Sequence, residues 1–280
     1  MLNGGMMQHQ FTGTEDYIAD DGLLADVNAA IVLEKPLLVR GEPGTGKTML
    51  AEAVSDALGL KLIRWHVKST TKAQEGLYTY DVVQRLNDSR FGGGDVENIS
   101  YYIRMGPLGE AFSSDEQVIV LIDEIDKADI EFPNDLLREL DEMAFDIPET
   151  KETVRAKHRP IVLITSNAEK ELPDAFLRRC LFHYIEFPTP DRMRQIVQAH
   201  HPNLDTELVT AAIDRFYSLR RVDGLRKKPS SSELLDWLAV LSRMGASPDL
   251  IRTQVPLMGA LIKREQDVAL LNQLRARRRF

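Results

Sequence analysis

Runs of apolar residues alternate with helical periodicities over the first two thirds of the chain. Apolar runs that predict strands lie at 36–40, 61–67, 118–122, 161–165 and 182–187. Helical patterns lie at 20–33, 48–58, 70–86 and 133–144. The uninterrupted apolar run at 118–122 is typical of a strand buried on both faces of a parallel sheet. This alternation predicts an α/β fold with a parallel sheet flanked by helices.

The pattern changes beyond Pro188 and Pro190, where only helical periodicities continue. Helices are predicted at 192–199, 206–219, 231–242 and from 250 onward. At the other end, the first residues are polar and without periodicity, which is typical of a flexible terminus. We therefore expect a flexible N-terminus over 1–12, an α/β core over 13–188 and a small all-α domain over 189–280.

Two insertions interrupt the regular alternation of the core. Residues 90–104 contain three consecutive glycines and are expected to form a loop or hairpin, and residues 145–156 are expected to form a second hairpin. Four of the seven tyrosines, at 78, 80, 101 and 102, lie around the first insertion. They fit two interpretations equally well, exposed rings that grip a partner or ordinary local packing.

Charge and composition narrow the class of protein. The net charge of −8 argues against a nucleic-acid binder that works through bulk electrostatics. The single cysteine, Cys180, excludes an internal disulfide and fits a reducing compartment. No apolar run has the length of a membrane span, and the first residues lack the pattern of a secretion signal. We therefore expect a cytoplasmic protein.

The clearest candidate for chemistry follows the first strand, where a loop has the spacing G-x-x-x-x-G-K-[ST]. Its glycines permit positive φ, which turns backbone N–H groups into a concavity that fits a phosphate. Lys47 can reach the β and γ oxygens of a nucleotide, and the hydroxyl of Thr48 can hold Mg²⁺ at a helix N-terminus. The residues expected to bind nucleotide are Gly41, Glu42, Pro43, Gly44, Thr45, Gly46, Lys47, Thr48 and Met49.

Two acidic residues follow the buried strand at 118–122. Asp123 would lie at the sheet edge where parallel folds bind ligands, so it can complete the metal site begun by Thr48. Glu124 points to the other side and can act on an attacking water as a general base. The alternative is an acidic loop or a helix cap, and the preceding phosphate-binding motif favours the catalytic interpretation.

Four segments together resemble AAA+ ATPases in order and spacing. They are GEPGTGKT from Gly41, VLIDEIDKA from Val120, the strand ending in ITSN at Asn167, and LPDAFLRRC from Leu172. They are similar to the Walker A, Walker B, sensor 1 and arginine-finger segments. The two insertions resemble the helix-2-insert group and, within it, the MoxR family, including the maturation ATPases of carbon monoxide dehydrogenases. The resemblance spans about 15–245 and implies a P-loop NTPase core followed by a helical lid domain.

The resemblance also implies roles for single residues, with ATP and Mg²⁺ as cofactors. Asn167 is similar to the sensor that positions the water beside Glu124. Arg179 is similar to the finger that reaches a nucleotide bound by the neighbouring subunit, and the adjacent Arg178 is the alternative. Together with Lys47, these residues form the expected catalytic set.

The sequence departs from the family at the second sensor, where an arginine usually begins a lid helix. The matching stretch is KKPSSSELLDWL over 227–238, and serines occupy the expected site. Either Lys227 or Lys228 substitutes for the arginine, or the contact is missing.

The resemblance implies a Mg-dependent ATPase that forms a ring, expected to be a hexamer, and acts as a chaperone. Its client would be a protein or metalloenzyme that it remodels or matures, with a separate von Willebrand factor A domain adaptor. Two alternatives stay open. One is a nucleic-acid-stimulated motor or loader, and the other is a nucleotide-dependent scaffold without turnover. The basic stretch 275–280 fits either an acidic partner or a cationic helix end.

Overall fold

The computed structural model describes residues 10–14 and 17–277, which divide into two units. One unit contains the described residues up to Gly41 together with Gly46–Ile185. The other contains Glu42–Thr45 and the described residues from Glu186 onward. Residues 1–9 of the predicted flexible terminus lie outside the described residues. Phe11, in the same predicted segment, is buried in the core of the first unit.

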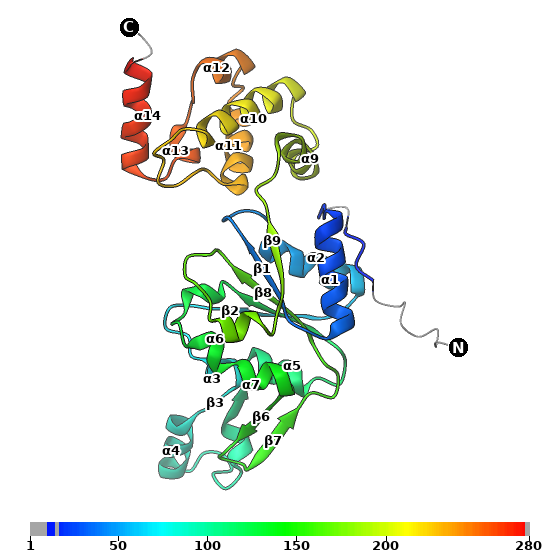
Figure 1. Cartoon of the computed structure of the whole chain (residues 1–280). Helices are drawn as coiled ribbons and strands as arrows, with labels where there is room; N and C mark the ends of the chain where they lie inside the picture. Colours follow the sequence, from blue (N-terminus) through cyan, green and yellow to red (C-terminus); the bar gives the residue numbers. More distant parts are fainter. Residues whose placement is uncertain (1–9, 15–16, 278–280) are drawn as a thin grey trace, which may run out of the picture. The chain divides into compact units, whose positions relative to one another are not determined.

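A five-stranded parallel sheet forms the centre of the first unit, with the strand order β2-β5-β8-β1-β9 (Figure 1). The strands are β1 Leu37–Gly41, β2 Leu62–His66, β5 Ile119–Asp123, β8 Ile161–Ser166 and β9 Leu181–Ile185. All five residues of β5 are buried, as the apolar run predicts. Because every strand runs in the same direction, the polar residues that follow β1, β5 and β8 meet at one edge of the sheet.

Helices cover both faces of this sheet. Two helices, α1 Asp21–Leu33 and α2 Lys47–Leu58, pack on one face. The other face is covered by α3 Ala73–Leu77, α5 Pro107–Ser113, α6 Phe132–Asp135, α7 Leu137–Glu142 and α8 Asp174–Leu177, with the short 3₁₀ helix η2 Ile125–Lys127. Successive strand residues point to opposite faces, so Ile119 and Leu121 join the first core while Val120 and Ile122 join the second. The predicted α/β fold, a parallel sheet flanked by helices, is confirmed.

Local signals set the ends of the first two helices. The side chain of Asp20 accepts a hydrogen bond from the N–H of Leu23 at 2.8 Å and caps α1. Gly59 ends α2 in the left-handed region at φ 65°, where a residue without Cβ meets little steric resistance. Both ends agree with the sequence pattern.

The helix predicted over 70–86 is wrong, because a strand interrupts it. The chain forms α3, then β3 Tyr78–Tyr80, then α4 Val82–Phe91. After the 3₁₀ helix η1 Ile99–Tyr102, the strand β4 Ile103–Met105 pairs antiparallel with β3. The ring of Tyr78 stacks on that of Phe145, with 6.0 Å between centroids. Contacts from distant segments therefore override the local helical periodicity.

The tyrosines around this insertion are mostly packed inward. Tyr78 and Tyr102 are buried, and Tyr80 packs against the core in part. The hydroxyl of Tyr102 donates to Asp88 at 3.0 Å. Only Tyr101 among the four exposes most of its ring, so local packing accounts for the other three.

The second predicted hairpin is confirmed as β6 Ala144–Ile147 paired with β7 Glu152–Arg155. Together with β3 and α4 it lies at the end of the first unit drawn lowest in Figure 1. The helix predicted over 133–144 is divided at Leu136 into α6 and α7.

The described residues of the second unit after 185 form helices joined by loops, with no strand among them. Its helices are α9 Pro190–His200, α10 Thr206–Arg220, α11 Ser231–Arg243, α12 Pro248–Thr253, α13 Met258–Leu261 and α14 Glu265–Arg277. They pack around Phe216 and Trp237, which are fully buried. The pattern from 250 onward is three helices rather than one, and residues 278–280 of the basic stretch lie outside the described residues. Among the described helices, none combines the length and the apolar character needed to cross a membrane.

Candidate functional site

The loop between β1 and α2 has the conformation that the glycine spacing predicts. Gly44 and Gly46 lie in the left-handed region at φ 79° and 85°, which L side chains rarely adopt. Within the loop, Thr45 Oγ1 donates to the carbonyl of Glu42 at 2.9 Å. Lys47 is 7% exposed, and its ammonium donates to the carbonyl of Gly41 at 2.8 Å. The ammonium is therefore held against the loop, where a phosphate would replace the carbonyl as its partner.

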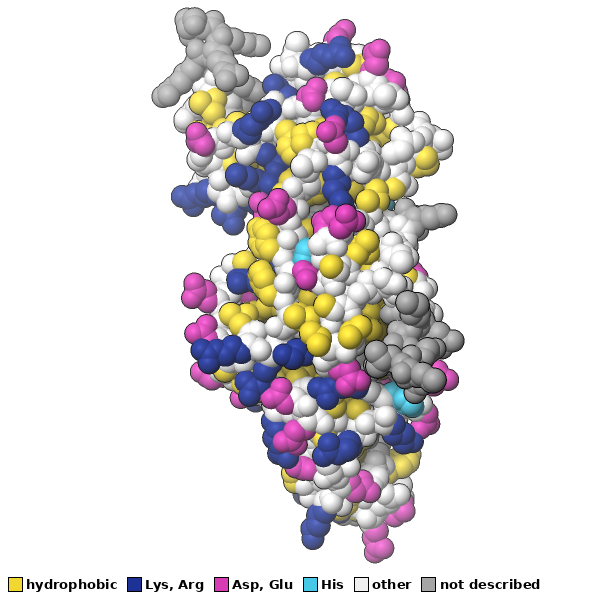
Figure 2. All heavy atoms as spheres, turned by 45° about the vertical axis from the view of Figure 1, so that its right-hand side comes forward, with side chains coloured by type: hydrophobic (Ala, Val, Ile, Leu, Met, Phe, Trp, Pro, Cys, Tyr) yellow, Lys and Arg dark blue, Asp and Glu magenta, His cyan; other side chains and the backbone are white. Residues whose placement is uncertain are grey.

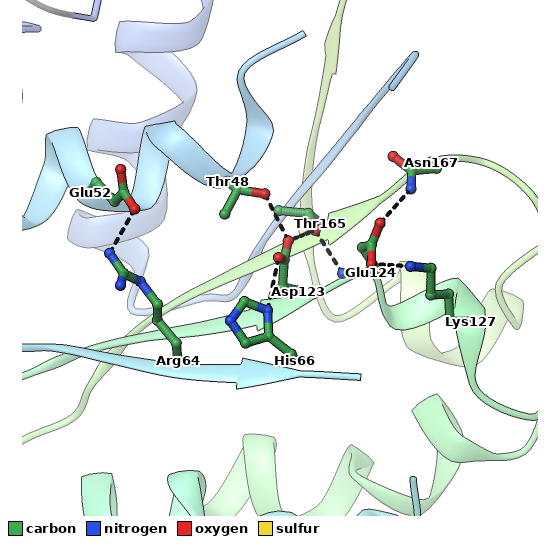
Figure 3. A network of polar contacts seen from close by, with 9 residues as sticks. All are labelled: Thr48, Glu52, Arg64, His66, Asp123, Glu124, Lys127, Thr165 and Asn167. Atoms are coloured by element: carbon green, nitrogen blue, oxygen red, sulfur yellow. Dashed lines mark hydrogen bonds and ion pairs between the residues drawn. The ribbon is translucent and has the colours of Figure 1, made fainter. Parts of the chain in front are cut away.

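Asp123 lies next to this loop and collects three polar side chains from neighbouring elements (Figure 3). One of its carboxylate oxygens accepts from Thr48 Oγ1 at 3.0 Å and from Thr165 Oγ1 at 2.6 Å. The other lies 3.3 Å from His66 Nδ1. Asp123 is 6% exposed, so these contacts replace the hydration that burial removes from the carboxylate. The structure thus brings together the two residues expected to hold the metal.

Glu124 has an unusual backbone conformation directly after the strand. It lies in the left-handed region at φ 59°, and its N–H donates to Thr165 Oγ1 at 2.8 Å. Its carboxylate accepts from Asn167 Nδ2 at 3.1 Å and from the ammonium of Lys127. Figure 3 shows this side chain turned toward Asn167 and away from Thr48. One hydroxyl, that of Thr165, therefore contacts both acidic residues, the carboxylate of Asp123 and the backbone N–H of Glu124.

The ion pair with Glu124 also affects its cationic partner. The hydrogen bond to the Glu124 carboxylate raises the pKa of Lys127 above its usual value. The two side chains border an open pocket of about 540 Å³, together with the segments 66–69 and 169–170. Glu124 therefore has protein partners on both carboxylate oxygens and still faces an open space at the sheet edge.

The two candidate finger arginines are placed apart from this network. Both follow α8, and Arg179 forms an ion pair with Asp141 at 2.6 Å. A second guanidinium nitrogen of Arg179 donates to the carbonyl of Ala175 at 2.9 Å. The contacts of Arg179 are therefore with Asp141 and Ala175, and not with Asp123 or Glu124.

The second-sensor stretch has a structural explanation inside the helical unit. Ser230 caps α11 in a reciprocal capping box with Glu233. The ammonium of Lys227 lies 3.1 Å from a carboxylate oxygen of the same Glu233. Serine at this position begins the helix, and the lysine stabilises the capping glutamate.

Sequence reasoning missed His66, Thr165 and Lys127 as parts of the network. A usable signal existed for the first two, since each is a polar residue at the carboxyl end of a strand. His66 is the register partner of Asp123, which places both side chains on the same face of neighbouring strands. Thr165 lies near the end of β8, the other neighbour of β5.

Comparisons with known proteins agree with this geometry. A family profile described as "ATPase family associated with various cellular activities (AAA)" matches residues 37–189, more than half of the chain. Among solved structures, a proline-to-glycine mutant of RuvB from Thermotoga maritima is similar, with a TM-score of 0.57 and 12% identity. That likeness covers 86% of this chain and 71% of the RuvB chain, and at this identity it shows the fold alone. A comparison with curated protein sequences found no match.

Proposed function

Because this chain belongs to the AAA family of ATPases, we propose that it binds ATP with Mg²⁺ and hydrolyses it at the carboxyl edge of the sheet. One observation carries this proposal. The hydroxyl of Thr48 and the carboxylate of Asp123 lie 3.0 Å apart beside a loop that has two glycines at positive φ. A hydroxyl and a carboxylate are hard oxygen donors, which are the ligands that Mg²⁺ prefers.

The residues present fit the two cofactors. Gly44 and Gly46 leave room for backbone N–H groups to approach a phosphate, and Lys47 supplies the positive charge. Thr48 and Asp123 would hold Mg²⁺, which neutralises charge on the phosphoryl group in the transition state. The remaining work falls to side chains of this protein that position the attacking water.

We assign the activation of the attacking water to Glu124. Its carboxylate can accept the proton that the water loses, and Asn167 fixes the carboxylate through the 3.1 Å hydrogen bond. The ammonium of Lys127 occupies the second oxygen, so a water must compete with it for that carboxylate. Glu124 is therefore poised for catalysis but not yet free for it in the state described.

The proposal is tested by Glu124→Gln, which keeps the shape and removes the base. We expect ATP hydrolysis to fall at least about 100-fold, the scale of general-base catalysis, while a fluorescent ATP analogue binds within about twofold of the parent. The matched control is Glu52→Gln, since Glu52 forms only an exposed ion pair with Arg64 at 2.7 Å. An unchanged rate in Glu124→Gln would show that Glu124 is not the base. Binding without turnover in the parent protein would favour the scaffold alternative.

We further propose that the protein forms a homo-oligomeric ring, a hexamer, in which Arg179 acts on the nucleotide of the neighbouring subunit. AAA proteins assemble typically in this way, and Arg179 contacts no acidic residue of its own site. A finger supplied in trans stabilises charge on the transferred phosphoryl group. In the free subunit, its guanidinium is instead held by Asp141.

Mixing two inactive variants tests the trans arrangement. Glu124→Gln lacks the base and Arg179→Ala lacks the finger, so each alone should be inactive. In a randomly mixed ring, about one quarter of the interfaces combine an intact base with an intact finger. We expect the mixture to hydrolyse ATP at about that fraction of the parental rate. A second mixture, with Arg178→Ala in place of Arg179→Ala, tests the adjacent residue. A mixture as inactive as its two components would refute catalysis in trans.

On the client, we propose a chaperone of the MoxR type that works with a von Willebrand factor A domain adaptor and matures a protein or metalloenzyme. The support is the order of the four motifs and the two insertions. Residues 90–104 lead into β4, the partner strand of β3, and residues 145–156 contain most of the β6–β7 hairpin. The test is the ATPase rate with and without a purified von Willebrand factor A domain protein. Stimulation by the adaptor is expected, and stimulation only by a nucleic acid would contradict the proposal.

The nucleic-acid alternative predicts an extended basic surface. On the face drawn in Figure 2, acidic and basic side chains are interspersed over the lower half of the view. Single-stranded and duplex DNA should therefore leave the ATPase rate within about twofold at moderate salt. Stimulation of many-fold would make a nucleic-acid motor the better interpretation.

A further inference from the structure

Two loops at the catalytic edge of the sheet are joined by hydrogen bonds that run in both directions. The loop after β5 supplies the carboxylate of Asp126, which accepts from the N–H of Asn167 at 3.3 Å and from the N–H of Glu169 at 2.8 Å. The loop after β8 supplies the ammonium of Lys170, which donates to the carbonyls of Lys127 at 3.2 Å and Ala128 at 2.7 Å. The loops that carry the base and its amide partner are thus held together.

The burial of Asp126 shows why these bonds matter. Its side chain is 2% exposed, and a carboxylate is costly to bury unless its oxygens are hydrogen-bonded. Between its two N–H donors lies Ala168, in the left-handed region at φ 60°. That conformation is strained for a residue with Cβ and persists only where the surroundings enforce it. The two bonds to Asp126 supply this enforcement from both sides of Ala168.

We propose that Asp126 is a positioning residue for the reaction. It clamps the backbone at 167–169 so that the side-chain amide of Asn167 meets Glu124 at 3.1 Å. This inference rests on the proposed function of Glu124 as the base. Asp126 itself touches no reacting atom, and its effect on hydrolysis passes through Asn167.

The variant Asp126→Asn tests the clamp with little change in shape. The amide nitrogen of the new asparagine would face one of the two backbone N–H groups, and two donors form no hydrogen bond. One of the two bonds that hold the loop at 167–169 is therefore lost. We expect kcat to fall about tenfold or more while the fluorescent ATP analogue binds within about twofold. Asn167→Ala should give a similar loss. The double variant should then be no slower than the slower single variant, because both changes remove the same contact.

Asp267→Asn is the matched control. Asp267 is 1% exposed and also accepts two backbone N–H groups, from Arg226 at 2.8 Å and Lys227 at 3.1 Å. If Asp267→Asn lowers the rate, its double variant with Asn167→Ala should show the product of the two single losses. If the double variant of Asp126→Asn with Asn167→Ala also shows the product of its single losses, Asp126 only stabilises the fold, which would overturn the positioning role. A parental kcat in Asp126→Asn would overturn it too.

A second measurement covers the case in which Asp126→Asn does not fold. Amide hydrogen exchange of the parent protein should show a protected N–H at Glu169, and the protection should persist in Asn167→Ala. Exchange of that N–H at the rate of an open loop would show that there is no clamp.

The proposed function of Glu124 and the proposed clamp by Asp126 fail in different ways. Parental rates in both Glu124→Gln and Asn167→Ala would refute the assigned chemistry. A slow Asn167→Ala beside a fast Asp126→Asn would refute only the clamp.

Discussion

The hydroxyl of Thr165 is the smallest group on which the site depends, and removing it gives a sharp prediction. Thr165 is 1% exposed and lies in β8 beside the acidic strand. It donates to Asp123 at 2.6 Å and accepts from the N–H of Glu124 at 2.8 Å. Thr165→Val keeps the volume and the branched shape and removes both bonds.

The magnitude follows from what each bond contributes. A hydrogen bond to a charged group contributes about 1.5–3 kcal/mol, and a partly buried N–H left without a partner costs about 1–3 kcal/mol. Burying an apolar methyl group in place of the hydroxyl offsets part of this cost, so we expect the free energy of unfolding to fall by about 3 kcal/mol. For a unit of this size the midpoint of thermal unfolding should fall by about 6–12 °C. Thr165→Ser retains both bonds and loses one methyl group, with an expected loss of about 1 kcal/mol.

Fluorescence can follow the α/β unit alone. The chain has two tryptophans, Trp65 in the α/β unit and Trp237 in the helical unit. In a Trp237→Phe background, Trp65 reports only on the unit that contains Thr165. Equal midpoints for Thr165→Val and Thr165→Ser would refute the reasoning, since the serine variant keeps the hydroxyl and the valine variant does not. A valine variant as stable as its parent would do the same.

Three further predictions concern other parts of the chain. Lys127→Met should lower the thermal midpoint by less than about 4 °C, because its ion pair with Glu124 is partly exposed and such pairs contribute about 1 kcal/mol at most. Burial raises the pKa of the Cys180 thiol to about 12, so at pH 8 its thiolate fraction is about 1000-fold below that of a free cysteine. Ellman's reagent should label it slowly until urea unfolds the chain, and the thiol should destabilise the fold as the pH rises from 9 toward 12; fast labelling of the native protein would contradict this. Gly109→Ala should destabilise by about 3 kcal/mol or more, since its Cβ would lie 2.0 Å from a backbone oxygen of α3, whereas Gly259→Ala meets nothing within 4 Å and should be neutral or slightly stabilising in urea unfolding.

Much of the fold could be predicted because its signals are local. The strand at 118–122 is identified by consecutive apolar residues, and the structure buries all of β5. Gly59 ends α2 because glycine enters the left-handed region easily. The phosphate-binding loop is likewise a property of a short stretch, since Gly44 and Gly46 take positive φ there.

The first insertion shows where local reasoning fails. Residues 70–86 have helical periodicity, yet Tyr78–Tyr80 forms a strand. Its partner strand begins at Ile103, and the ring of Tyr78 rests on Phe145. Neither partner can be read from the periodicity, because both contacts join segments far apart in the sequence. For the same reason the sequence left two interpretations open for Tyr102, which the structure buries with a hydrogen bond to Asp88.

By itself, the sequence determined the class of fold, the phosphate-binding loop and the acidic pair after the central strand. These follow from apolar runs, glycine conformations and charged residues at strand ends, all of which act over a few residues. Only the tertiary structure decided that Thr165 bridges the two acidic residues, that Lys127 and Asn167 share Glu124, and that Asp126 clamps the next loop. A hydrogen bond needs two atoms within about 3.5 Å. The order and register of parallel strands set that distance, and no local pattern encodes them.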